Sequence, residues 1–309
     1  MNPRFRAPAV VGALLLALAT VAACAPAATP AASAPPNGSA ATTDIYPVMI
    51  SSELIVGENR VLFSFQDASG APIAKPNRTV EISFTGPNGE AVSAENGQFI
   101  WSIENAVGIF VTHATFPSAG NWMASFTTVA PGSPEQTIPF SFDVKAKASA
   151  IQKGQPAPSV DTPTLADVGG DVTKISTDAS PDPAFYQTSV ADALAAHKPF
   201  VLVFATPKFC QTKTCGPTLD KVKAVAAKHP DVTFINVEPY QLKVVDGALQ
   251  PVLDANGQLQ ATDVTNEWGL LSEPWIFAVD RNGVVQGSYE LTITPSELEA
   301  ILPIITKGG

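Results

Sequence analysis

Basic residues are scarce in this sequence. Its 309 residues include 18 Lys and Arg against 28 Asp and Glu, which gives a formal net charge of −10. Proteins that bind nucleic acids present a stripe or patch of Lys and Arg to the phosphate groups. Nothing in this sequence supplies such a stripe, so we expect no nucleic-acid partner.

Long hydrophobic runs are also missing. The apolar stretch at residues 9–19 is shorter than the roughly 20 residues that a spanning helix needs. It follows Arg4 and Arg6 and ends in small residues directly before Cys24. This pattern resembles the signal peptide of bacterial lipoproteins, in which the cysteine receives a diacylglyceryl group. The resemblance implies a signal peptide at residues 1–23 and a lipid on Cys24 that holds the protein to a membrane of the cell envelope, outside the cytoplasm. The alternative is an ordinary secretory signal with a chance cysteine.

Cysteine is equally rare. With Cys24 assigned to the anchor, only Cys210 and Cys215 remain. An exported compartment is one in which disulfides form and persist, yet one pair is too sparse for a disulfide scaffold in a chain of this length. The pair could therefore be a redox site, a metal site or a single structural staple.

The remaining sequence divides by composition. Residues 24–42 are rich in Ala, Pro, Ser and Thr, which predicts a flexible tether. Residues 43–148 contain about seven short alternating segments separated by Gly, Pro and Asn, a pattern typical of an all-β immunoglobulin-like sandwich. No catalytic constellation occurs there. Residues 149–182 are again rich in Pro, Gly and Asp and predict a linker, which could lie extended on one of the domains.

Residues 183–309 predict helices and strands in the order helix, strand, helix, strand, helix, strand, strand, helix. A buried strand is expected at residues 200–205, directly before the cysteines, because the run is continuously apolar. The last helix is expected to begin at residues 294–297, where Thr-Pro-Ser-Glu combines a capping box with a proline in the first turn.

This order, with a cysteine after the first buried strand, resembles the thioredoxin fold, and in particular the TlpA-like thioredoxin lipoproteins. The segment NEWGLLSEPWIFAVDRNGVV is similar to the part of that family that runs through a cis-proline into the last hairpin. The resemblance implies an α/β thioredoxin-like domain at residues 183–309. It also implies thiol–disulfide exchange by Cys210 and Cys215 as catalytic residues, without a cofactor or a metal ligand.

The expected cis-proline, Pro274, and its two neighbours, Glu273 and Trp275, are implied to position the substrate. Glu273 departs from the family, which has an apolar residue or Thr there. A carboxylate near a thiol would raise the thiol pKa or serve as a base. Equally, Glu273 could be an exposed carboxylate that faces solvent.

The spacing of the cysteines departs from the family's Cys-x-x-Cys motif. Five residues of regular helix rise about 7.5 Å, whereas a disulfide needs Cα atoms within about 6.8 Å of one another. A bond between Cys210 and Cys215 therefore requires residues 211–214 to leave the helix. Alignment of Pro217 with the family's helix proline favours Cys210 as the nucleophile. A helix that begins at Cys215 would favour Cys215 instead.

We therefore expect a membrane-anchored thiol–disulfide oxidoreductase that acts on the thiols and disulfides of exported proteins, with a membrane thiol reductase as a possible partner. Two alternatives stay open. Two thiolates could hold Cu(I) in a copper chaperone, although His197 and His229 do not fall where a third ligand is expected. The pair could also be a structural disulfide in a redox-inert binding module.

Overall fold

The structure, a computed structural model, describes residues 45–307, which belong to one compact unit. The predicted signal peptide, the tether and Cys24 lie outside the described residues. Within residues 45–307 no helix is both long enough and apolar enough to cross a membrane.

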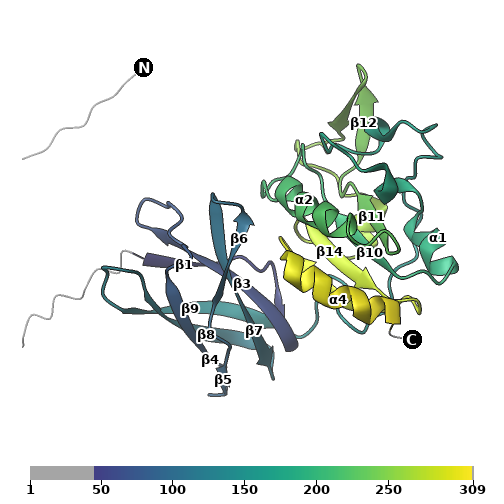
Figure 1. Cartoon of the computed structure of the whole chain (residues 1–309). Coiled ribbons are helices and arrows are strands. Elements are labelled where there is room, and N and C mark those ends of the chain that lie inside the picture. The colour runs from purple at the N-terminus through teal and green to yellow at the C-terminus, as the bar shows by residue number, and fades with distance from the viewer. Residues whose placement is uncertain (1–44, 308–309) are drawn as a thin grey trace, which may run out of the picture. The chain divides into compact units, whose positions relative to one another are not determined.

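Residues 45–145 form an immunoglobulin-like β-sandwich, as predicted (Figure 1). Its two sheets have the strand orders β1-β3-β7-β6 and β2-β9-β8-β4-β5. Buried and exposed residues alternate along β4, as expected for strands with one face on a core. The strands are β1 (Ile45–Met49), β2 (Leu54–Ile55), β3 (Gly57–Asp67), β4 (Thr79–Thr85), β5 (Ala91–Ser93), β6 (Gln98–Ile103), β7 (Val107–Phe116), β8 (Gly120–Val129) and β9 (Gln136–Lys145).

The segment predicted as a linker contains no strand and lies against the C-terminal core. It contains the short 3-10 helix η1 (Val172–Lys174), and a second one, η2 (Pro183–Tyr186), follows it directly. Ala150 is buried in one hydrophobic cluster of the C-terminal part, and Leu165 packs against another. The segment also forms backbone hydrogen bonds to the turn and strand around Gly283 and Val285. It is thus an extended covering of the C-terminal part.

The C-terminal part is built on a four-stranded sheet with the order β11-β10-β14-β15. Strand β10 pairs parallel with β11 and antiparallel with β14, and β15 continues from β14. Helices α2 and α4 pack on one face of the sheet, and α1 and α3 contribute to the cluster on the other. The elements are α1 (Val190–Ala195), β10 (Phe200–Phe204), α2 (Cys215–Ala226), β11 (Thr233–Val237), α3 (Asp263–Glu267), β14 (Trp275–Val279), β15 (Val285–Glu290) and α4 (Pro295–Lys307).

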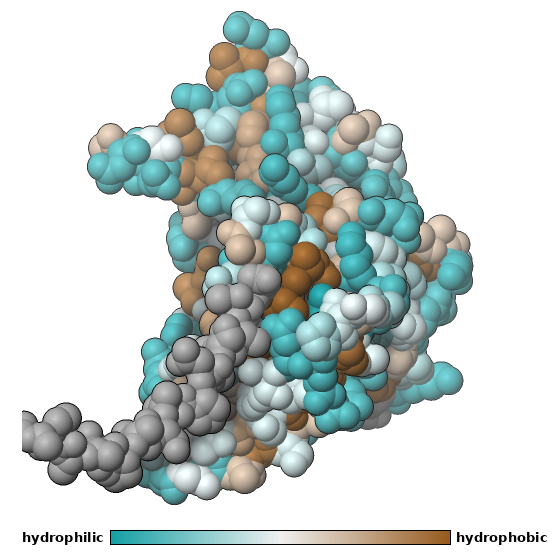
Figure 2. Space-filling model, turned by 90° about the vertical axis from the view of Figure 1, so that its left-hand side faces the viewer, coloured by the Kyte–Doolittle hydropathy of each residue, from teal (hydrophilic) through white to brown (hydrophobic). Residues whose placement is uncertain are grey.

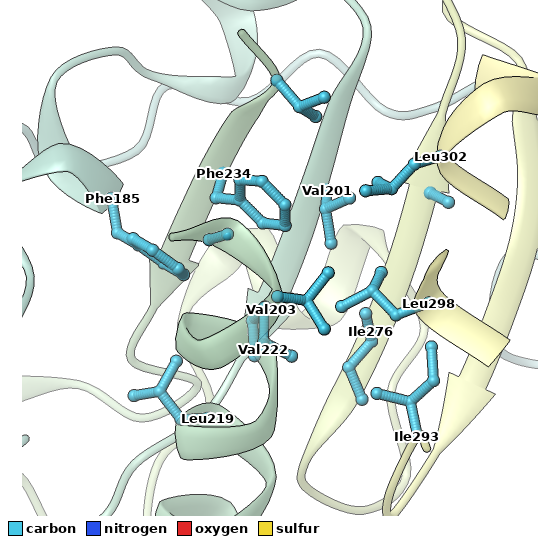
Figure 3. Packing of buried hydrophobic residues seen from close by; sticks show 14 of the residues in the cluster. Phe185, Val201, Val203, Leu219, Val222, Phe234, Ile276, Ile293, Leu298 and Leu302 are labelled. Atoms are coloured by element: carbon cyan, nitrogen blue, oxygen red, sulfur yellow. The ribbon is translucent and has the colours of Figure 1, made fainter. Parts of the chain in front are cut away.

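The face that carries the cysteines has an aliphatic core. Figure 3 shows Val201 and Val203 of β10 beside Ile276 of β14, with Leu219 of α2 and Leu298 of α4 in the same cluster. Because β10 is buried along its whole length, it is held firmly between its neighbours. The loop that leaves its end therefore starts from a fixed point.

A separate hairpin of β12 (Leu242–Val245) and β13 (Ala248–Pro251) interrupts the C-terminal part. A second turn, at Asn256-Gly257, lies between Leu253 and Leu259, which form an antiparallel bridge. The β12–β13 hairpin itself turns at Asp246-Gly247. Val244 and Val245 on this hairpin are exposed. On the face drawn in Figure 2, apolar patches are separated by hydrophilic surface.

The fold class predicted for residues 183–309, an α/β thioredoxin-like domain, is wrong. Of the described residues, 38% are in strands and 16% in helices. The α-helices of the described residues are short, from 5 residues in α3 to 13 in α4. The local features behind the prediction, a buried strand, a capped helix and a hairpin turn, are present. Each depends on a few neighbouring residues and occurs in many folds, so together they do not fix a fold family.

Replacement of Phe63 in the sandwich by Ala should lower the free energy of unfolding by about 3–5 kcal/mol, because the loss of a buried ring leaves a cavity. Phe63 is fully buried, and its ring centroid lies 4.9 Å from that of Phe126 and 5.6 Å from that of Phe110. Urea unfolding followed by circular dichroism measures the loss. Met123→Ala on the exposed side of β8 is the matched control and should change stability little. Equal losses in the two variants would contradict the described core.

Candidate functional site

Cys210 and Cys215 form a disulfide between the end of β10 and the start of α2. Their Cα atoms are 5.9 Å apart. Residues 211–214 leave regular helix, as the bond was predicted to require, and Lys213 has a φ of 64° in the left-handed region. Helix α2 begins at Cys215, which places Pro217 in its first turn.

The two sulfur-bearing residues differ in exposure. Cys215 is fully buried in the core beneath α2, whereas Cys210 is only partly buried. The backbone N–H of Cys215 donates a hydrogen bond to Cys210 Sγ over 3.2 Å. An N–H group in the first turn of a helix carries partial positive charge and favours a thiolate. The more accessible sulfur is therefore also the one that a helix N–H group contacts.

Glu273 holds the loop between the cysteines. Its Oε1 accepts a hydrogen bond from the Gln211 N–H over 2.7 Å, and its backbone oxygen accepts one from Thr212 Oγ1 over 2.9 Å. The hydroxyl of Tyr240 donates to its Oε2 over 2.6 Å. Burial, with this bond to Glu273, raises the pKa of Tyr240. Glu273 is only 4% exposed, so the alternative of a solvent-facing carboxylate is wrong.

The two residues that follow Glu273 have different surroundings. Pro274 is joined to Glu273 by a cis peptide bond and is buried, and its carbonyl accepts a hydrogen bond from the N–H of Leu291. Trp275 begins β14 and packs with Phe277 in the cluster on the opposite face from Cys215. The structure therefore brings Glu273 to the cysteine loop, and it does not bring the Trp275 ring there.

The disulfide sulfurs and the Glu273 carboxylate form a compact group of metal-binding atoms. One ligand atom from each residue lies within 4.8 Å of the other two. The histidines weighed as copper ligands bond elsewhere, His197 to the backbone of Arg281 and His229 to Glu299. No histidine is thus part of this group.

Glu238, which the sequence did not single out, is linked through Thr177 to Lys208, in the segment that leads to Cys210. It follows β11 and is 8% exposed. Its Oε1 accepts a hydrogen bond from the N–H of Thr177 over 2.6 Å, and Thr177 Oγ1 accepts one from the N–H of Lys208. Burial raises the pKa of Glu238 to about 7. The only sign of Glu238 in the sequence was its place directly after an apolar strand and before a proline. That pattern is a weak indication of a buried carboxylate.

Comparisons with known proteins assign no family. No family model and no curated protein matches the chain. Solved structures that match include a DUF4426 family protein from Pseudomonas aeruginosa, with 16% identity, a TM-score of 0.27, and coverage of 33% of this chain and 90% of that one. The filamin domain of Lin-41 matches with 16% identity, a TM-score of 0.21, and coverage of 33% and 91%. The Escherichia coli adhesin FdeC matches with 17% identity, a TM-score of 0.23, and coverage of 39% and 36%.

These likenesses are too weak to carry an argument about function. The strand-rich structure, whose described α-helices are short, overturns the resemblance to TlpA-like thioredoxin lipoproteins that the sequence suggested. The site must therefore be interpreted from its own geometry.

The raised pKa of Glu238 predicts a pH dependence of stability. The group titrates near 4.5 when unfolded and at about 7 when folded, so the folded state retains a proton that the unfolded chain releases. The protonated Glu238 side chain therefore contributes to the free energy of unfolding fully below about pH 4.5. This contribution is lost as the pH rises through 7, which lowers the free energy of unfolding by on the order of 3 kcal/mol.

Urea unfolding of Glu238→Gln between about pH 5 and pH 8 should show a smaller loss of stability than the wild type, because the amide does not titrate. Glu135→Gln, in an exposed turn of the sandwich, is the matched control and should behave as the wild type. Parallel pH profiles of Glu238→Gln and the wild type would contradict the raised pKa.

Proposed function

We propose that this protein is a thiol–disulfide oxidoreductase whose reacting pair is Cys210 and Cys215. The observation that carries the proposal is the asymmetry of the disulfide. Cys210 is the accessible sulfur and receives the helix N–H bond, whereas Cys215 is fully buried behind it. An attacking group needs access and thiolate character, and a resolving group needs only proximity.

In the reduced protein, the Cys210 thiolate attacks one sulfur of a substrate disulfide. The substrate S–S bond breaks, its second sulfur leaves as a thiolate, and a mixed disulfide to Cys210 forms. The Cys215 thiolate then attacks the Cys210 sulfur, which closes the internal disulfide and releases the remaining substrate sulfur as a thiolate. Two electrons have passed to the substrate. A dithiol returns the pair to its reduced form, and the same steps run backwards oxidise a substrate dithiol.

The hydrogen bonds of its loop support Cys210 as the attacking cysteine. Hydrogen bonds from Gln211 and Thr212 to Glu273 fix the loop that carries it, so its sulfur keeps its place over the helix terminus after reduction. Glu273 and Pro274 are buried beside this loop, so their role in the proposal is to position the loop from within the fold. Trp275 has no part in this, since its ring lies on the other face of the sheet.

The compartment and partners are part of the proposal. The small residues before Cys24 and the short apolar stretch that precedes them support export and a lipid anchor at that cysteine. A protein held there would act on the thiols and disulfides of exported proteins. A membrane thiol reductase would be a suitable source of electrons for the pair.

Single cysteine variants test the assignment of roles. In a chain that also carries Cys24→Ser, Cys215→Ser leaves Cys210 as the only thiol, and Cys210→Ser leaves Cys215. We expect the Cys210 thiol to react with a small aromatic disulfide at least about 100-fold faster than the buried Cys215 thiol. The release of the aromatic thiolate measures both rates. Equal rates, or faster reaction at Cys215, would contradict the proposed roles.

Turnover tests the activity itself. With a dithiol as reductant, the chain with both cysteines should reduce a model protein disulfide repeatedly, and either single variant should not. A pair that no dithiol reduces would leave a structural disulfide and would contradict the proposed function.

A further inference from the structure

We propose that the reduced pair, together with Glu273, forms a binding site for a divalent metal ion of the Zn²⁺ type. The inference rests on the proposed function in one respect, since both require that the disulfide can be reduced. It goes beyond that function because it assigns a ligand to the resting dithiol and a second role to Glu273. The sequence alone suggested only Cu(I) held by the two thiolates as a metal alternative, without Glu273.

The three donors come from two places in the chain and meet at one point. The sulfurs lie on either side of the loop before α2, and the carboxylate lies directly before β14. With one ligand atom from each, the three atoms are all within 4.8 Å of one another. In a tetrahedral zinc site with Zn–S near 2.3 Å and Zn–O near 2.1 Å, ligand atoms are about 3.5–3.8 Å apart. Opening of the S–S bond and a small side-chain rotation reach that spacing.

The chemistry of loading balances in two steps. A dithiol first gives two electrons and two protons to the disulfide and becomes a disulfide; a phosphine gives two electrons and becomes a phosphine oxide, with water supplying the oxygen and the two protons. Both cysteines become thiols. The metal ion then displaces the two thiol protons and binds both thiolates and the carboxylate. The net charge of the bound group is −1, against −3 for the ionised donors alone, so the ion offsets most of the repulsion between them.

The carboxylate decides the class of metal. Cu(I) prefers soft thiolate or thioether ligands and would gain little from Glu273. Zn²⁺ accepts cysteine sulfur and glutamate oxygen in one site. Three protein donors leave a fourth tetrahedral position for water or for a sulfur of a partner protein.

Neighbouring groups already hold the carboxylate in place. The Gln211 N–H bonds Oε1 and the Tyr240 hydroxyl bonds Oε2. Each carboxylate oxygen can accept more than one bond, so a lone pair remains for the ion. Groups that orient a ligand in this way commonly contribute 10–100-fold to metal affinity, which makes Tyr240 a positioning residue of the site.

Cobalt is the probe, because Co²⁺ replaces Zn²⁺ in such sites and absorbs light. The full chain with Cys24→Ser is reduced with a phosphine under exclusion of oxygen and titrated with Co²⁺. We expect one ion per chain, near-ultraviolet bands of two cobalt–thiolate bonds and visible bands of tetrahedral cobalt. Added Zn²⁺ should abolish these bands.

Two variants test the role of the carboxylate in metal binding, one at Glu273 and one at the residue that positions it. Glu273→Gln should weaken Co²⁺ binding at least about 10-fold, and Tyr240→Phe should weaken it by a smaller factor while all three ligands remain. Glu267→Gln, which removes an exposed carboxylate at the end of α3, is the matched control and should bind as tightly as the parent chain. Thermal melts of each variant show whether it is folded, and Tyr240→Phe keeps the test valid if Glu273→Gln is not.

Several results would overturn the inference. These are the absence of thiolate bands, unchanged affinity in both Glu273→Gln and Tyr240→Phe, or tight Cu(I) binding with no Co²⁺ or Zn²⁺ binding. If the metal-free chain still turns over a disulfide, only the metal site is lost. If the pair cannot be reduced at all, the metal site and the proposed function are both wrong.

Discussion

The buried carboxylate of Glu273 is the contact on which the site depends. It accepts one hydrogen bond from the loop between the cysteines and one from Tyr240. Without it, the Gln211 N–H and the Tyr240 hydroxyl would each lose a hydrogen bond to a charged group, a kind of bond that contributes about 1.5–3 kcal/mol. A carboxylate kept from water in this way fixes a loop that has no regular secondary structure of its own.

The sheet explains how this contact arises between Gln211 and Glu273, which are 62 positions apart. Phe204, the last residue of β10, lies opposite Trp275, the first residue of β14. The chain that leaves β10 therefore passes beside the residues that enter β14, which are Glu273 and Pro274. Helix α2 then begins at Cys215 and packs on the sheet through Leu219 and Val222. Strand pairing, helix packing and the buried carboxylate thus place both sulfurs together.

Several parts of this arrangement could be predicted from the sequence. The sandwich follows from local pattern, and the cysteine spacing shows that a Cys210–Cys215 bond needs a break in helix before Cys215. The bond itself was one of several possibilities that the sequence left open. The face of the sheet on which Trp275 lies could not be predicted in this way. Strand β14 is apolar at every position, so no alternation of apolar and polar residues shows which side chains point to which face. The burial of Glu273 and Glu238 depends on segments far away in the chain. The family assignment was wrong for a related reason. The buried strand, the capped helix and the hairpin turn were predicted correctly, but these local features occur in many folds and do not determine one.

The redox titration of Cys210 and Cys215 tests the central claim most directly. The purified protein would be equilibrated across a series of buffered dithiol potentials, and free thiols would be counted by mass after alkylation, with Cys24 accounted for separately. The account predicts a reversible two-electron transition above about −300 mV, where labile and catalytic disulfides are found. A disulfide that remains closed at every potential below that value would be a structural bond and would contradict the account.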